Sequence, residues 1–433
     1  SNPIHSTSAK SVLPMLAMRG LATGLCAGCV VGLLRLSHDR AAARVALWLE
    51  EWREVWWTVP IWFGVLVALA VILRRIVREE PLISGSGIPQ TELALAGRLS
   101  FTWWRVLLAK FLGSWLALFG GLALGREGPS IQMGGAVGAG FHALWRPAAP
   151  HALTGSPYVV AGAVAGLAAA FGAPAAGVLF AFEEMKSRRD TSLIVAACAS
   201  AIGAHLMIRI VFGMGRILPF AGFEAPPLSS FWIVALEGAV FGVLGVGYNK
   251  TLLWLHDREA GQTLIPDRWR ALPPLLLAGC LALFAPLLIG GGESLIIFVG
   301  EHDVALKTLI LLLAFKYLFA QYSTVASIPG GLLMPILCLG ALWGRLWAEL
   351  PVSALAAHGL ASGSVQPYVL FGMVSYFAAT VRAPLTGIVL VTEMSGTYTC
   401  LPGSLLAGLI ACKVANLLHC PPVYDSLKER IRL

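Results

Sequence analysis

Long apolar stretches recur along the whole chain and leave little sequence that could form the polar surface of a soluble fold. Of the 433 residues, 57% are hydrophobic and 12% charged, against about 25% charged in an ordinary soluble domain. A membrane helix must cross about 30 Å of hydrocarbon. Ten stretches span or nearly span that thickness, near 11–36, 57–75, 101–124, 157–182, 192–213, 229–254, 272–289, 306–325, 367–392 and 403–418. The sequence therefore predicts an all-α integral membrane protein with about ten or more helices.

The net charge of +8 comes from basic residues at the ends of apolar stretches. By the positive-inside rule these ends face the cytoplasm, as do both termini. No basic face alternates with polar sequence, so nucleic-acid binding is not expected. The basic groups are Arg74, Arg75 and Arg78; Lys186, Arg188 and Arg189; and Lys428, Arg430 and Arg432.

No linker or low-complexity tract divides the chain, so we expect a polar tail at 1–10 and a single transmembrane domain at 11–433. Cys26 and Cys29 form a CxxC pair inside a Gly/Ala-rich apolar stretch. Helix packing is favoured there over metal binding or redox chemistry. We expect no metal site.

The chain resembles itself at a fixed offset, which is typical of transporters. Residues 160–185 align with 370–394, and a second block aligns at a slightly different offset. We expect a first repeat at about 11–213 and a second at about 229–420, followed by a tail at 421–433. Chance alignment of small apolar residues is the alternative, and the match does not tell whether the halves are parallel or inverted. The pairs are Gly162/Gly372, Pro174/Pro384 and Glu183/Glu393 at offset 210, and Lys110/Lys316, Gly125/Gly331 and Pro129/Pro335 at offset 206.

Three segments place a glycine-rich turn before a proline in the first turn of an apolar helix: GSGIP (85–89), GREGP (125–129) and GGLLMP (330–335). The first amides of a helix have no partner within it, and a membrane offers no bulk water to supply one. Broken helices of this kind must surround a cavity, and their positive ends favour an anion. The three starts predict a site for a small monovalent anion.

Glu127 places a carboxylate in one of these helix starts, where it must be paired, protonated or functional. One interpretation is an ion pair with Arg126 that holds a loop at the membrane surface. The other is a tethered anion, which occupies the anion site when ionised and leaves it when protonated.

Two further positions allow a structural and a functional interpretation. Glu183 and Glu184 end an apolar stretch; a cap neutralised by nearby bases suits Glu183, whereas Glu184 aligns with Met394 and is present in one half only. Tyr424 follows the last apolar stretch as an interfacial aromatic or a functional hydroxyl, and Tyr398 has an equal claim on this basis.

GSGIP, GREGPSIQ, FGAPAAGVLFAFEEM, PGGLLMP, APLTGIVLVTEM and a terminal Pro-x-Tyr, in this order, resemble the CLC family of chloride channels and chloride/proton antiporters. The resemblance covers nearly the whole chain. It implies a homodimer in the membrane lipid in which each subunit holds its own pore, with about eighteen tilted or broken helices in two inverted repeats. The short C-terminus resembles bacterial members without cytoplasmic regulatory domains, which places the protein in the bacterial inner membrane.

The resemblance also implies roles for individual residues. Ser86 and Tyr424 match the side chains that coordinate the central chloride, and backbone amides of the helix starts line the chloride sites. Glu127 matches the gating glutamate, and Glu184 matches the inner proton-transfer glutamate of the antiporters. The transported ions are chloride and protons, with no cofactor. The amides would be those of Gly128, Leu332, Leu333 and Met334.

One position departs from the family pattern, because Leu333 stands where phenylalanine is usual. Leucine leaves the backbone amides available but changes packing or the width of the path. Ser86 accords with chloride-preferring members, whereas proline there would suggest nitrate. We therefore expect chloride/proton exchange, with a passive chloride channel as the alternative. An intramembrane enzyme is not expected, because no HExxH motif or nucleophile/base pair occurs.

Overall fold

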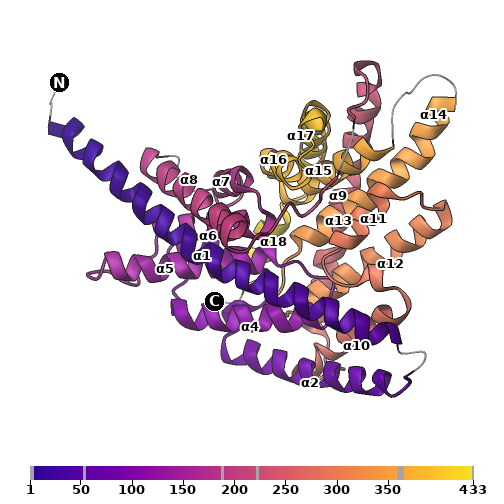
Figure 1. Ribbon diagram of the computed structural model, residues 1–433, viewed down its shortest axis with the longest axis horizontal. Helices are drawn as coiled ribbons and strands as arrows, with labels where there is room; N and C mark the ends of the chain where they lie inside the picture. The colour runs from indigo at the N-terminus through magenta and orange to yellow at the C-terminus, as the bar shows by residue number, and fades with distance from the viewer. Residues whose placement is uncertain (1–3, 52–54, 187–189, 221–223, 358–364, 432–433) are drawn as a thin grey trace.

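The computed structural model describes residues 4–51, 55–186, 190–220, 224–357 and 365–431, which form eighteen α-helices and no strand (Figure 1). The predicted all-α architecture is confirmed. Arg188, Arg189 and Arg432 lie outside the described residues. The helices are α1 (Ile4–Glu50), α2 (Thr58–Glu79), α3 (Ile88–Leu95), α4 (Trp103–Phe119), α5 (Glu127–Trp145), α6 (Pro157–Phe171), α7 (Pro174–Glu183), α8 (Thr191–Leu206), α9 (Phe231–Gly261), α10 (Leu272–Phe284), α11 (Glu293–Glu301), α12 (Leu306–Val325), α13 (Leu333–Trp347), α14 (Ser353–Ala357), α15 (Gln366–Val381), α16 (Pro384–Ser395), α17 (Leu401–Leu417) and α18 (Val423–Lys428).

Hydropathy undercounts these helices because several are short and meet end to end. Among the described residues, seven helices are long and apolar enough to span a membrane. The apolar stretch at 157–182 is not one helix, since α6 ends at Phe171, Gly172 follows in the left-handed conformation (φ 66°), and α7 begins at Pro174. Proline has no N–H to continue the helix ladder, so the chain must break there. The stretch at 367–392 divides in the same way into α15 and α16.

The two halves are inverted relative to each other. Gly125 and Gly331, which are equivalent in the repeat, form an isolated antiparallel bridge in which each donates its N–H to the other's carbonyl at 2.7 Å. A reciprocal pair between equivalent residues lies on the two-fold axis that relates the halves. The repeat predicted from the sequence is therefore a structural one, and its axis passes through the loops before α5 and α13.

Glycines hold the two helices beyond this bridge against their neighbours. A Cβ on Gly134 of α5 would lie 2.1 Å from the carbonyl oxygen of Gly162 in α6. In the second half a Cβ on Gly340 of α13 would lie 2.6 Å from the carbonyl oxygen of Gly372 in α15. Small residues let membrane helices approach this closely, so α5 and α13 are held rigidly by equivalent contacts.

The repeated glutamates join the two halves. The Glu183 carboxylate accepts the backbone N–H groups of Leu385 (3.2 Å) and Thr386 (2.6 Å) at the start of α16. Glu393 accepts those of Ala175 (3.1 Å) and Ala176 (2.9 Å) at the start of α7. The interpretation of Glu183 as a cap neutralised by nearby bases is wrong, because its partners are the free amides of the opposite half's helix.

We expect Glu393→Ala to reduce stability by about 1–2 kcal/mol, as the loss of a helix N-cap does, because two amides of α7 lose their acceptor. Thermal unfolding of the detergent-solubilised protein would measure the loss. Glu301→Ala, which removes an exposed carboxylate at the end of α11, is the control. Equal unfolding temperatures for both variants would contradict the capping role.

Candidate functional site

Two buried lysines shape the loops that begin the short helices. Lys110 Nζ donates to the carbonyl oxygens of Ile83 and Gly85, both at 2.7 Å. Its repeat partner Lys316 donates in the same way to Leu288 (2.9 Å) and Gly290 (2.7 Å). Both lysines are fully buried. Because each ammonium group draws carbonyls toward itself, the amides that follow are left to face the other way, toward the helix starts.

The three predicted helix starts come together in the structure. Gly85 donates to the carbonyl of Ile328 (3.2 Å) and accepts from the amide of Gly330 (3.0 Å), which ties the loop before α3 to the loop before α13. A Cβ on Gly128 would lie 2.8 Å from the Cβ of Ser86, and one on Gly331 would lie 2.9 Å from the Gly128 nitrogen. The starts of α3, α5 and α13 therefore meet around one point, as an anion site requires.

Four backbone amides were named from the sequence, and three of them precede the first hydrogen bonds of their helices. The first helical hydrogen bond of α5 runs from Ser130 N–H to Arg126, and that of α13 from Ile336 N–H to Leu332. The amides of Gly128, Leu333 and Met334 precede these bonds and so have no partner within their helices. Leu333 itself is fully buried in the central apolar core, so the change from the usual phenylalanine affects packing rather than the number of amides.

A fourth helix start escaped the sequence analysis. Gly290–Gly292 precede α11 in the second half as Gly85–Gly87 precede α3 in the first, and Gly292 takes a left-handed conformation (φ 107°) as Gly87 does (φ 90°). The signal was hidden because Ser294 replaces the helix-start proline, Pro89. Lys316 binds the carbonyls of this loop as Lys110 binds those of the loop before α3, which shows that the two helix starts are equivalent.

Ser86 and Tyr424 differ in how their hydroxyls are bound. The Ser86 oxygen accepts the Ile88 N–H at 3.3 Å, at the start of α3. Tyr424 is fully buried, and its hydroxyl has no protein partner among the described residues. It lies within electrostatic reach of both Glu127 and Glu184. Tyr398 is 62% exposed, so of the two tyrosines only Tyr424 is buried.

Glu127 is fully buried at the first position of α5. Its carboxylate faces the amides of Glu127 and Met334 without reaching hydrogen-bond geometry. It touches the backbone so closely that a Cβ on Gly125 would lie 2.0 Å from Oε2. The side chain therefore lies among the free amides, where a bound anion would lie.

Arg126 does not pair with this carboxylate. Its guanidinium donates to Asp39 on α1 (3.0 Å) and pairs with Glu293 at the start of α11 (2.8 Å). The interpretation of Glu127 as one half of a Glu–Arg pair is wrong. Arg126 instead fixes the loop before α5 to two other elements.

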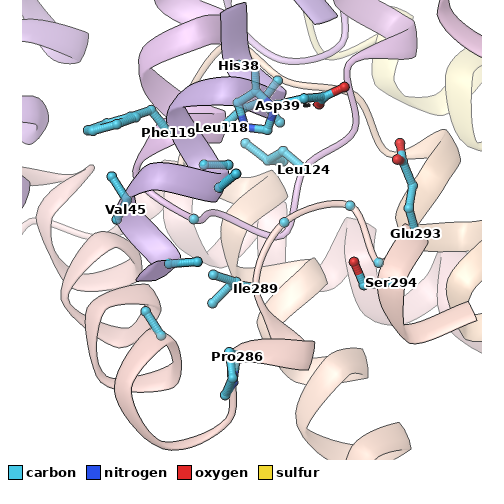
Figure 2. A pocket seen from close by; sticks show the side chains of 18 of the residues that line it. His38, Asp39, Val45, Leu118, Phe119, Leu124, Pro286, Ile289, Glu293 and Ser294 are labelled. Atoms are coloured by element: carbon cyan, nitrogen blue, oxygen red, sulfur yellow. Dashed lines mark hydrogen bonds and ion pairs between the residues drawn. The ribbon is translucent and has the colours of Figure 1, made fainter. Parts of the chain in front are cut away.

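Glu127 borders an open cavity of about 640 Å³. We call this cavity the vestibule (Figure 2). The lining is mixed: His38 and Asp39 lie beside the apolar Leu118 and Leu124, and Glu293 lies apart from them (Figure 2). An ion that passes Glu127 would enter this space.

Glu184 lies in a cluster of charges around the end of α7. The side chain is 5% exposed, and the charges that act on it belong to Glu92, Asp425, Lys186 and Lys428. Lys428 binds both Glu92 and Asp425, and Lys186 binds Asp425 at 2.8 Å. Sequence analysis missed Glu92, although its place in α3, shortly after GSGIP, was a signal.

A further buried carboxylate was also missed. Glu237 lies in α9, is fully buried, and neither of its oxygens has a partner among the described residues. The nearby hydroxyl of Tyr368 is likewise unpaired. An ionisable residue inside a membrane segment was a signal in the apolar stretch at 229–254.

Comparison with known proteins identifies the class. The profile of the family described as "Voltage gated chloride channel" matches residues 63–416, and the chain belongs to this family, the CLC family named above. It is 35% identical to the "H(+)/Cl(-) exchange transporter ClcA" of Vibrio campbellii over 416 residues, covering 93% of this chain and 87% of that protein. It is 31% identical to the protein of the same name from Klebsiella pneumoniae, covering 97% and 89%.

Solved structures show the same fold. A "slow cyanobacterial Cl-/H+ antiporter" superimposes with a TM-score of 0.86 at 28% identity, covering 95% of this chain and 97% of that one. A "CLC-type fluoride/proton antiporter" superimposes with a TM-score of 0.71 at 19% identity, covering 96% and 98%, and supports the fold alone. The predicted fold, two inverted repeats of broken membrane helices, is confirmed.

We expect Gly125→Ala to displace the Glu127 carboxylate, because the added methyl group would occupy the place of Oε2. The carboxylate is the end of a flexible side chain, so the fold should survive. Chloride flux from liposomes should rise and the number of protons moved per chloride should fall. Gly247→Ala, where a methyl group meets nothing within 4 Å, is the control. Unchanged coupling in Gly125→Ala would contradict the close contact.

Proposed function

We propose that this protein exchanges chloride for protons across the membrane. The observation that carries the proposal is the Glu127 carboxylate, buried among the free amides of converging helices, where it can act as a tethered anion. The names of the Vibrio and Klebsiella relatives and of the cyanobacterial structure support the same activity. Transport, rather than catalysis, is the function, and no cofactor takes part.

Chloride would bind at two adjoining places. Ser86 and Tyr424 would hold the central ion with their hydroxyl groups, and the amides of Gly128 and Leu332–Met334 would hold ions nearer the vestibule. Partial charges of this kind replace the hydration shell without binding the ion so tightly that it cannot leave. Support comes from the unpaired Tyr424 hydroxyl and from the contact between Gly128 and Ser86.

Protons would enter from the opposite side through Glu184. The carboxylates and lysines around it are polar groups that could carry protons from the cytoplasmic face, and Tyr424 lies within electrostatic reach of both Glu184 and Glu127. Protonated Glu127 has no charge to hold it among the amides, so it leaves and chloride takes its place. Ionised Glu127 returns when chloride departs. The two ions therefore cannot move independently.

We also infer that the protein is a homodimer with one pore per subunit, placed in the bacterial inner membrane with both termini in the cytoplasm. Support comes from the family's arrangement and from the basic groups Lys186 and Lys428, which gather at the Glu184 end. The apolar side chains that face outward on α8 and α17, such as Ile202 and Leu409, suit contact with lipid or with a second subunit.

We expect Glu184→Gln to keep chloride flux and lose proton flux, because the amide cannot carry a proton in exchange. Purified protein in liposomes, recorded with chloride and pH electrodes together, would measure both. Wild-type protein should move protons uphill when a chloride gradient is applied, and Glu301→Gln should behave like the wild type. A wild type that passes chloride without protons would instead indicate a passive channel.

A second variant tests the tethered anion. Glu127→Gln should also lose proton coupling, since the neutral side chain can neither compete with chloride nor bind a proton. Uphill proton movement that persists in this variant would contradict the role of Glu127.

A further inference from the structure

The vestibule beside Glu127 contains an arginine held between two acids. Arg126 has 7% of its side chain exposed and binds Asp39 and Glu293, whose side chains are 52% and 34% exposed. The acids come from α1 and α11, and both line the cavity (Figure 2). A buried cation thus receives two anionic partners, and neither of them is Glu127.

The position of Glu293 is specific to the second repeat. It is the first residue of α11, and its counterpart at the start of α3 is Ile88. The repeat therefore provides the loop and the helix, and the carboxylate is an addition in one half. A glutamate at a helix start gains from the free amides, but here its side chain reaches Arg126 instead.

Several charged groups share this region with Glu293 and bear on the ionisation of Glu127. From α1 these are Arg35, His38, Asp39 and Glu50, and from α5 and the loop before it Glu127 and Arg126. Arg35 donates to the carbonyl of Ala169 at 2.7 Å. Arg126 is the cation next to Glu127 in the chain, so its charge matters most for whether the Glu127 carboxylate is ionised.

We propose that Glu293 is a positioning residue that controls Glu127 through Arg126. With both acids ionised, the two terminal nitrogens of the guanidinium are paired, and its attraction for Glu127 is offset by nearby negative charge. Glu127 then takes a proton from the vestibule, or keeps one, at a lower proton concentration than it otherwise would. Loss of the Glu293 charge would leave Arg126 free to favour the ionised carboxylate, because an opposite charge favours the charged form.

The proposal rests on the proposed function of Glu127 as a protonated gate. The test is the pH dependence of chloride efflux from liposomes when only the pH on the vestibule side is varied. Glu293→Gln should move the half-maximal pH toward acid by about half to one unit, less than the shift of about 1–3 units from a directly adjacent charge, because Glu293 acts through Arg126. Glu293→Asp, which keeps the charge, should stay near the wild type.

A matched control lies at the other end of α13. Arg345 is likewise held between two acids, Asp303 (3.4 Å) and Glu349 (2.6 Å), and the Glu349 side chain is 30% exposed. Glu349→Gln should leave the pH dependence unchanged. If Glu293→Gln is not recovered folded, Glu293→Ala provides a second neutral variant.

A double variant shows whether the effect acts through Glu127. In a Glu127→Gln background, Glu293→Gln should produce no further shift. A shift that persists there, or an unchanged half-maximal pH in the single variant, overturns the proposal. Proton uptake by the wild type in the same liposomes tests the proposed exchange separately from the role of Glu293. No proton uptake would refute exchange, whereas the pH dependence of chloride efflux decides the role of Glu293.

Discussion

Backbone amides without partners in the middle of a membrane are the constraint on which this structure depends. Lys110 and Lys316 draw loop carbonyls away, and in the described part of the chain the amides of Gly128, Leu333 and Met334 have no partner within their helices. Neither lipid nor an apolar side chain can supply one. An anion, or a carboxylate that replaces it, must complete the fold. The site is thus a consequence of how the helices begin, and the Glu127 carboxylate, which faces these amides without hydrogen-bonding to them, is the negative group that the chain itself places there.

The sequence predicted those features whose physical cause is local. Glycine and proline mark a helix start within a few residues, so GREGP and GGLLMP were interpretable without a structure. The equivalence of Gly125 and Gly331 followed from spacing, and the reciprocal bridge between them gave it a physical basis. Inversion of the halves did not follow, because a sequence offset carries no direction in space.

Features that depend on distant partners were not predictable. Arg126 stands beside Glu127 in sequence, yet its partners are 87 and 167 residues away, at Asp39 and Glu293. Glu183 similarly precedes a basic run but binds amides of the opposite half. In both cases sequence proximity suggested an ion pair, and the fold offered a better acceptor or donor. A charge in a membrane protein has few possible partners, so the topology decides which one it meets.

The comparison of equivalent positions separates what the fold requires from what transport requires. Residues that shape the helix starts or join the halves are the same in both repeats: the lysines, the bridging glycines, and Glu183 with Glu393. Carboxylates that can carry or control a proton are not the same, since the positions equivalent to Glu127, Glu184 and Glu293 in the other repeat hold Leu333, Met394 and Ile88.

Helices α1 and α9 occupy equivalent places in the two halves and differ in the same way. Gly20 and Gly238 make equivalent contacts with Ala196 and Ala407. The preceding residues are Arg19, which binds the Tyr158 hydroxyl at 2.8 Å, and Glu237, which lies near the equivalent Tyr368 without a bond. A symmetric pore would bind anions alike from both sides. Direction in the handling of protons therefore has to come from residues that break the symmetry.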